Sequence, residues 1–92
     1  MTINEAINHP AATIVDVRSE DEFASGNVPG SVNIPLHTVP DLVEDFKNMS
    51  QPIVLCCLSG GRSGQALIYL QAQGVEGLHN GGGYSEVLIH KM

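Results

Sequence analysis

The chain has 92 residues, 42% of them hydrophobic and only 15% charged, and it carries a formal net charge of −6. This composition excludes a disordered chain, and the length predicts one domain over residues 1–92, because domains commonly contain about 100–150 residues. Four basic residues are scattered among ten acidic ones, so we expect no binding to nucleic acid and none to an anionic membrane surface.

Short helices and strands alternate along the first part of the chain. A capping box, in which a Thr or Ser is followed three residues later by Glu, predicts helices over residues 2–8 and 19–24. Residues 12–17 are almost continuously apolar or β-branched, which predicts a strand covered on both faces. Residues 31–34 lie between a Pro-Gly pair and a further proline and predict a second, shorter strand.

The rest of the chain continues this alternation. Residues 38–48 predict a third helix, with the threonine at the first position as its cap and a proline in its first turn. Residues 53–56 predict a buried strand, which is followed by a glycine-containing loop over residues 57–62. A helix over residues 63–73, a strand over residues 76–79, a glycine run and a short C-terminal helix complete the pattern.

Strands that alternate with helices predict an α/β fold with a mostly parallel central sheet, since right-handed crossovers place helices on both faces. The segments described above supply four strands. In sheets of this kind ligands bind at the carboxyl ends of the strands, and the loop over residues 57–62 follows one of them.

Cys57 is the strongest candidate for a catalytic residue. It follows the buried strand and begins a loop with two consecutive glycines, just before a helix. Glycines allow successive backbone N–H groups to point toward one centre, a geometry that binds anions. Together with the positive end of the helix and the guanidinium of Arg62, these groups favour a thiolate over a thiol. The same groups, with the hydroxyl of Ser63, would hold an anionic substrate.

Residues 57–63 resemble the active-site loop of rhodanese-type sulfurtransferases, in which four residues separate a cysteine from an Arg-Ser pair that opens a helix. Residues 16–23 resemble the first signature of that family, and residues 26–35 resemble its second. Residues 80–84 resemble the glycine pair that precedes its last helix. The resemblance extends from about residue 12 to residue 88, which is nearly the whole chain.

This resemblance implies a rhodanese-like sheet of four to five strands and the transfer of sulfane sulfur through a persulfide on Cys57. A small anionic donor such as thiosulfate would supply the sulfur, and a thiol, a protein thiol or cyanide would accept it. The resemblance implies that the following loop residues bind the substrate: Leu58, Ser59, Gly60, Gly61, Arg62 and Ser63. We expect no cofactor, and the adjacent cysteines lack the spaced histidines that a zinc site would need.

Other residues are interpreted as structural support or as departures from the family. Asp16 and Arg18 flank the end of the first strand as supporting residues, and we expect Arg18 to form an ion pair with Glu22. Asn27 stands where the family usually has a histidine. The aromatic residue usual after the glycine pair is absent, and Tyr84 is the nearest ring to line the pocket.

Two alternatives stay open. Counted from Cys56, Arg62 has the Cys-x5-Arg spacing of protein-tyrosine phosphatases, which suggests a phosphatase or an arsenate reductase. Ser59 stands where that motif has glycine, and Cys56 continues a buried strand, so we expect Cys56 to pack in the core. The second alternative is a non-catalytic binding module on the same fold. The chain lacks a membrane-length apolar stretch and a signal-peptide pattern, so we expect a cytoplasmic protein.

Overall fold

The four strands form one sheet in which every neighbouring pair is parallel. The computed structural model describes all residues, 1–92, and orders the strands β2-β1-β3-β4. The strands are β1 (Thr13–Asp16), β2 (Val32–Asn33), β3 (Ile53–Cys57) and β4 (Leu78–Gly83). The α/β class and the count of four strands are therefore confirmed, and the fully apolar strand β3 lies inside the sheet with all five residues buried.

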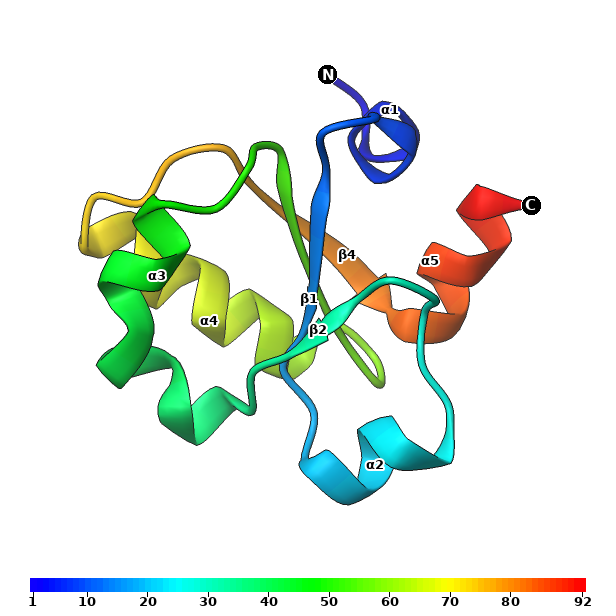
Figure 1. Ribbon diagram of the computed structural model, residues 1–92, viewed down its shortest axis with the longest axis horizontal. Coiled ribbons are helices and arrows are strands. Elements are labelled where there is room, and N and C mark those ends of the chain that lie inside the picture. Colours follow the sequence, from blue (N-terminus) through cyan, green and yellow to red (C-terminus); the bar gives the residue numbers. More distant parts are fainter.

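Helices cover both faces of this sheet (Figure 1). They are α1 (Ile3–Asn8), α2 (Glu20–Ser25), the 3₁₀ helix η1 (Leu36–Leu42), α3 (Val43–Lys47), α4 (Gly61–Ala72) and α5 (Tyr84–Lys91). Both predicted capping boxes are present, at Thr2 for α1 and at Ser19 for α2. No helix combines the length and the apolar character needed to cross a bilayer.

The alternation of side chains along β3 divides the interior into two cores. Ile53, Leu55 and Cys57 belong to the larger core, which includes residues of η1, α3 and α4. Val54 and Cys56 belong to the smaller core, which includes residues of α1 and α5. The two adjacent cysteines are therefore on opposite faces of the sheet.

The segment predicted as one helix over residues 38–48 is instead the 3₁₀ helix η1 followed by α3. The helical turn begins at Leu36, so Thr38 lies inside it and does not cap it. The Thr38 hydroxyl donates to the carbonyl of Pro35 at 2.7 Å. Pro40 then falls in the interior of η1, where a residue without an N–H cannot make an α-helical hydrogen bond, and this favours the tighter 3₁₀ turns.

The last strand was predicted over residues 76–79, ahead of the glycine run, whereas β4 begins at Leu78 and extends through the glycines to Gly83, so the predicted bounds were wrong. In β4 the glycines continue the strand, and Gly82 and Gly83 pair with Cys56 and Cys57 of β3. The reason is close packing: a Cβ atom on Gly81 would lie 2.8 Å from a methyl group of Val54, and one on Gly83 would lie 2.5 Å from the carbonyl oxygen of Leu58. Glycine is required there because another part of the chain occupies the space of a side chain.

Phe46 on α3 provides a test of the larger core, because its side chain is fully buried. We expect Phe46→Ala to lower the free energy of unfolding by about 3–5 kcal/mol, from lost apolar burial and the cavity that remains. Urea unfolding measures this value. Ile68→Ala is the control, since Ile68 is 70% exposed on α4 and its truncation should change stability by less than about 0.5 kcal/mol. Equal effects of the two substitutions would contradict this packing.

Candidate active site

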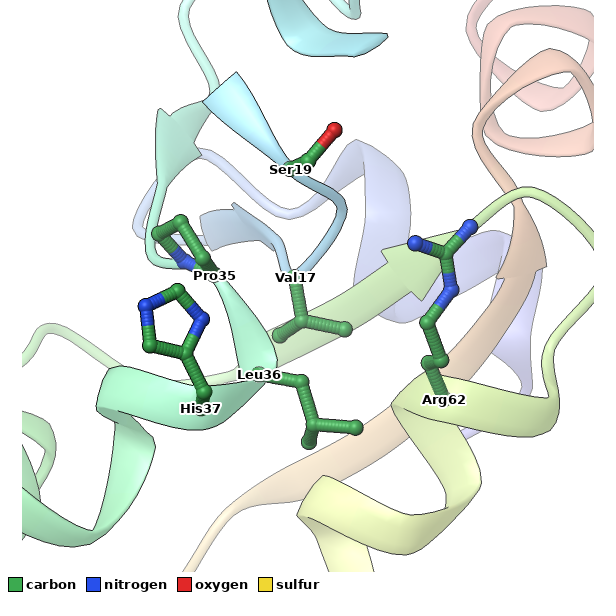
Figure 2. Close-up of a pocket in the computed structure, with 6 residues that line it drawn as sticks. All are labelled: Val17, Ser19, Pro35, Leu36, His37 and Arg62. Carbon is green, nitrogen blue, oxygen red and sulfur yellow. The ribbon is translucent and has the colours of Figure 1, made fainter. Parts of the chain in front are cut away.

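An open groove of about 330 Å³ lies near the carboxyl ends of β1 and β2, beside the start of α4 (Figure 2). Its lining residues come from the segments that follow these strands and from the first turn of α4: Val17, Ser19, Pro35, Leu36, His37 and Arg62. Among these lining residues, Arg62 alone belongs to the segment predicted to bind the substrate. One feature of the sequence could have predicted the other lining residues: they directly follow the carboxyl ends of two parallel strands, where ligands bind in such sheets.

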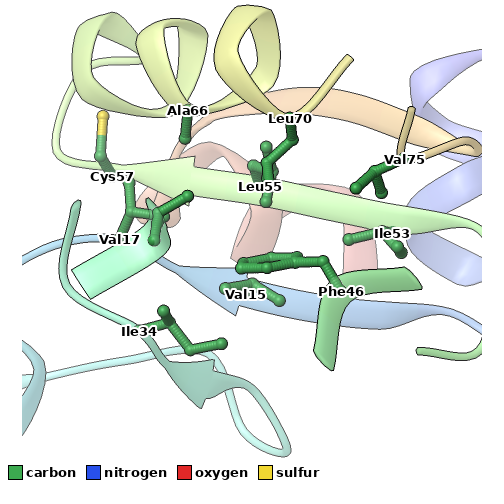
Figure 3. Packing of buried hydrophobic residues seen from close by; sticks show 11 residues of the cluster. Val15, Val17, Ile34, Phe46, Ile53, Leu55, Cys57, Ala66, Leu70 and Val75 are labelled. Atoms are coloured by element: carbon green, nitrogen blue, oxygen red, sulfur yellow. The ribbon is translucent and has the colours of Figure 1, made fainter. Parts of the chain in front are cut away.

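Cys57 lies closer to the helix than the sequence suggested. It is the last residue of β3, and α4 begins at Gly61, so the connecting loop contains residues 58–60 only. The predicted loop over residues 57–62 was therefore too long. Figure 3 shows the Cys57 sulfur near the beginning of α4, at one end of the larger core. Cys57 is 1% exposed, so it is buried like Cys56.

The turn depends on Gly60, which has a φ of 99° in the left-handed region. This conformation directs the Gly60 N–H to the Cys57 sulfur, with a nitrogen-to-sulfur distance of 3.0 Å. A Cβ atom on residue 60 would lie 3.3 Å from the Cα atom of Gly82 on β4. Both the φ angle and the neighbouring strand therefore require glycine at this position.

The surroundings of Cys57 favour its thiolate. Burial of the sulfur raises the pKa, but hydrogen bonds from the Ser63 hydroxyl and from the backbone N–H groups of Ser63, Ser59 and Gly60 outweigh burial and lower the pKa to about 7. The Ser63 oxygen lies 3.5 Å from the sulfur. A large fraction of Cys57 is therefore ionised at neutral pH, as a nucleophilic thiol requires.

The surroundings of Cys56 favour its neutral thiol. Burial, reinforced by the nearby Asp16 carboxylate, raises the pKa of its thiol to about 12. Its side chain packs in the smaller core, on the face of the sheet away from Cys57. Cys56 therefore does not supply the thiolate that the phosphatase hypothesis needs.

Arg62 is engaged by a carboxylate. Its guanidinium donates to the two carboxylate oxygens of Glu22 at 2.7 and 3.0 Å. The Arg62 guanidinium, with the Ser19 N–H, holds the pKa of the Glu22 carboxyl at about 2. Arg62 was expected to favour the Cys57 thiolate, and the two groups do interact electrostatically, since Cys57 contributes to a raised pKa of Arg62. The main causes of the lowered Cys57 pKa are the hydrogen bonds at the turn.

The expected ion pair between Arg18 and Glu22 was wrong. Arg18 pairs with Asp16 at 2.7 Å, because Asp16 is fully buried and its carboxylate needs a nearby cation. Arg18 reaches only the backbone carbonyl of Glu22, at 3.3 Å, and it also donates to the carbonyl of Gly26 at 2.6 Å. The Asp16–Arg18 pair thus supports α2 and holds Glu22 where its carboxylate can meet Arg62.

Tyr84 and Asn27 contact residues that support or belong to helix α2. The Tyr84 ring lies 3.8 Å from the guanidinium carbon of Arg18, so it stacks on Arg18 and does not line the groove. The Asn27 amide donates to the carbonyl of Phe23 at 2.8 Å, at the end of α2. Both side chains therefore stabilise the segment that carries Glu22.

The chain belongs to the rhodanese-like domain family, whose model matches residues 2–90. It is 30% identical over 76 residues to thiosulfate sulfurtransferase GlpE of Pseudomonas syringae, across 83% of this chain and 71% of that protein. It is 31% identical over 85 residues to GlpE of Stutzerimonas stutzeri, across 92% of this chain and 77% of that one.

Solved structures agree with this membership. A rhodanese-like domain protein from Staphylococcus aureus superposes with a TM-score of 0.75 at 33% identity, covering 91% of this chain and 81% of that chain. The human single-domain sulfurtransferase TSTD1 superposes with a TM-score of 0.67 at 29% identity, covering 86% of this chain and 82% of that chain. The family and the fold implied by the sequence are confirmed, and the relatives support sulfurtransferase activity for this protein.

The origin of the lowered Cys57 pKa can be tested with two serines of the turn. Ser63→Ala removes the hydroxyl donor, and we expect the pKa of Cys57 to rise by about one unit, as for loss of a hydrogen bond to a charged group. The pH dependence of alkylation, localised to Cys57 by peptide mass, measures this pKa. Ser59→Ala is the matched control, because Ser59 is exposed and donates through its backbone N–H. Equal titrations for both variants would contradict the role of the Ser63 hydroxyl.

Proposed function

We propose that this protein transfers sulfane sulfur from thiosulfate to a thiol or to cyanide through a persulfide on Cys57. The observation that carries the proposal is the Cys57 thiol, whose pKa is lowered to about 7 at the turn between β3 and α4. The GlpE relatives, which are named thiosulfate sulfurtransferases, support thiosulfate as the donor. The catalytic role of Cys57 and the substrate-binding role of residues 58–63 are part of this proposal.

The reaction has two displacement steps. The Cys57 thiolate attacks the outer sulfur of thiosulfate, a new sulfur–sulfur bond forms, and the original one breaks as sulfite leaves with its electron pair. An acceptor nucleophile then attacks the outer sulfur of the persulfide, and Cys57 is released as a thiolate. With cyanide the product is thiocyanate. Each step is a nucleophilic displacement, so donor and acceptor bind in turn.

Backbone N–H groups carry the main electrostatic role in this scheme. The Gly60 N–H already donates to the Cys57 sulfur at 3.0 Å, and the backbone N–H groups of Ser59 and Ser63 also favour the thiolate, so these donors are fixed before the reaction begins. Donors held in place at the start of α4 stabilise negative charge on sulfur without a rearrangement during the reaction. Leu58, Ser59 and Gly61 contribute through the backbone of the same turn.

The groove supports an approach for the donor. Val17 lines the groove and also packs in the same core cluster as Cys57, so one side chain belongs to both the groove wall and the core that holds Cys57. Arg62 on its wall is the group suited to the sulfonate oxygens of thiosulfate. Because Glu22 occupies both terminal nitrogens of Arg62, an anionic donor must share or displace this carboxylate.

Two further proposals concern the domain organisation of the protein and its location in the cell. We propose that residues 1–92 act as one domain and that the protein works in the cytoplasm. Both cysteines are free, and a reactive thiol such as Cys57 remains available in a reducing compartment.

Intact mass spectrometry tests the persulfide directly. After incubation with thiosulfate, we expect the protein to gain the mass of one sulfur atom, and cyanide should remove it. The gain should map to the peptide that contains Cys57.

Two cysteine variants assign the sulfur. Cys57→Ser should lose both the mass gain and the formation of thiocyanate, while Cys56→Ser, the neighbouring control, should retain them. Thiocyanate formation at the full rate by Cys57→Ser would refute the proposed function.

A further inference from the structure

The hydroxyl of Ser63 lies between two acceptors. Its oxygen is 3.5 Å from the Cys57 sulfur and 2.7 Å from Oδ1 of Asn80, and the contact geometry allows donation to either. A serine hydroxyl has one proton, so it can donate to only one of the two at a time. The two contacts are therefore alternatives.

The side-chain amide of Asn80 has a defined orientation. Its Nδ2 group donates to the carbonyl of Gly60 at 3.1 Å, and its Oδ1 atom accepts from the N–H of Gly82 at 3.0 Å. Rotating the amide by half a turn would place a donor against the Gly82 N–H and an acceptor against the Gly60 carbonyl. Oδ1 therefore faces Ser63, and it can only accept.

A bulge in β4 brings Asn80 to this position. Asn80 pairs with Leu55 and Gly82 pairs with Cys56, so Gly81 is an extra residue without a partner on β3. Bulges redirect the side chains next to them and are frequent near active sites. Asn80 consequently lies over the first turn of α4, where its Nδ2 atom would be 3.4 Å from a Cβ atom on Gly64.

We propose that Asn80 is a positioning residue that competes with the Cys57 sulfur for the single hydroxyl proton of Ser63. While Cys57 is a neutral thiol, Ser63 donates to Asn80. When Cys57 loses its proton to solvent, the thiolate is the stronger acceptor and the hydroxyl rotates toward it. The oxygens of Ser63 and Asn80 then face each other without a proton between them, which opposes ionisation. Asn80 thereby limits how strongly Ser63 can favour the thiolate.

The neighbouring ionisable groups do not replace this interaction. They are Asp16 on β1, Arg18 between β1 and α2, Glu22 on α2, His37 on η1, Cys56 on β3, Arg62 on α4, and Tyr84 and Glu86 on α5. The hydrogen bonds of Ser63 and Asn80 involve none of these groups. A change of Asn80 to alanine therefore leaves the surrounding charges in place.

The proposal rests on the proposed role of Cys57 as the sulfur acceptor, but its test reads the thiol itself. In Asn80→Ala the Ser63 hydroxyl donates to the thiolate without competition. We therefore expect the alkylation midpoint of Cys57, the pH at which its alkylation rate is half-maximal, to fall by about one pH unit. Asn80→Asp should raise this midpoint, because a carboxylate holds the proton more strongly and adds a negative charge. Alkylation by iodoacetamide, followed by peptide mass at Cys57, measures both variants without thiosulfate.

The Ser63→Ala background separates competition from a merely structural role. In that background Asn80→Ala should leave the alkylation midpoint unchanged, because there is no proton to compete for. If Asn80 acted only by holding Gly60, Asn80→Ala would raise the midpoint in both backgrounds, and that result would overturn the proposal. Gly60 keeps the bond from the Gly64 N–H to its carbonyl at 2.9 Å, which preserves the turn in the variant.

A failure of the persulfide assay with normal titrations would refute the proposed function and leave the role of Asn80 intact. An unchanged midpoint in Asn80→Ala with an intact persulfide assay would refute the role of Asn80 alone. Thermal unfolding of each variant checks that the fold is retained, which is expected because Asn80 is exposed.

Discussion

The left-handed turn at Gly60 is the constraint on which the site depends. It directs one backbone N–H to the Cys57 sulfur, and its carbonyl accepts from both Asn80 and the first turn of α4. Strand β4 passes close to this turn, since a Cβ atom at residue 60 would lie 3.3 Å from the Cα atom of Gly82. Glycines in the turn and in β4 let the two backbones approach closely, and the Asn80 side chain links them by hydrogen bonds to the Gly60 carbonyl and the Gly82 N–H.

Charge near the site is organised in pairs. The acidic chain has few cations, and the two arginines near Cys57 are each held by a carboxylate, Arg18 by Asp16 and Arg62 by Glu22. Arg18 connects the two pairs, because it also holds the backbone of α2 near Glu22. The thiolate consequently depends on neutral donors, the backbone N–H groups and the Ser63 hydroxyl, whose strength is set by geometry.

Local patterns predicted those features that depend on a few neighbouring residues. The capping boxes at Thr2 and Ser19, the buried strand before Cys57 and the helix after it were all visible in the order of residues. Features that depend on distant neighbours were missed or wrong. The glycine run that follows the predicted last strand is itself part of β4, where β3 and the turn before α4 take up the space of its side chains.

By itself, the sequence determined the α/β class, which follows from periodicity, and the family, which follows from motifs that resemble those of the family in the same order. It also predicted that Cys56 is buried in a strand and that Cys57 stands next to the loop, since these features depend on residues close together in the chain. Only the tertiary structure decided which carboxylate Arg62 meets and which side chain shares the Ser63 hydroxyl. Glu22 and Asn80 are 40 and 17 residues away from these partners. Crossovers between parallel strands bring such residues together, and their contacts depend on packing that no local pattern records.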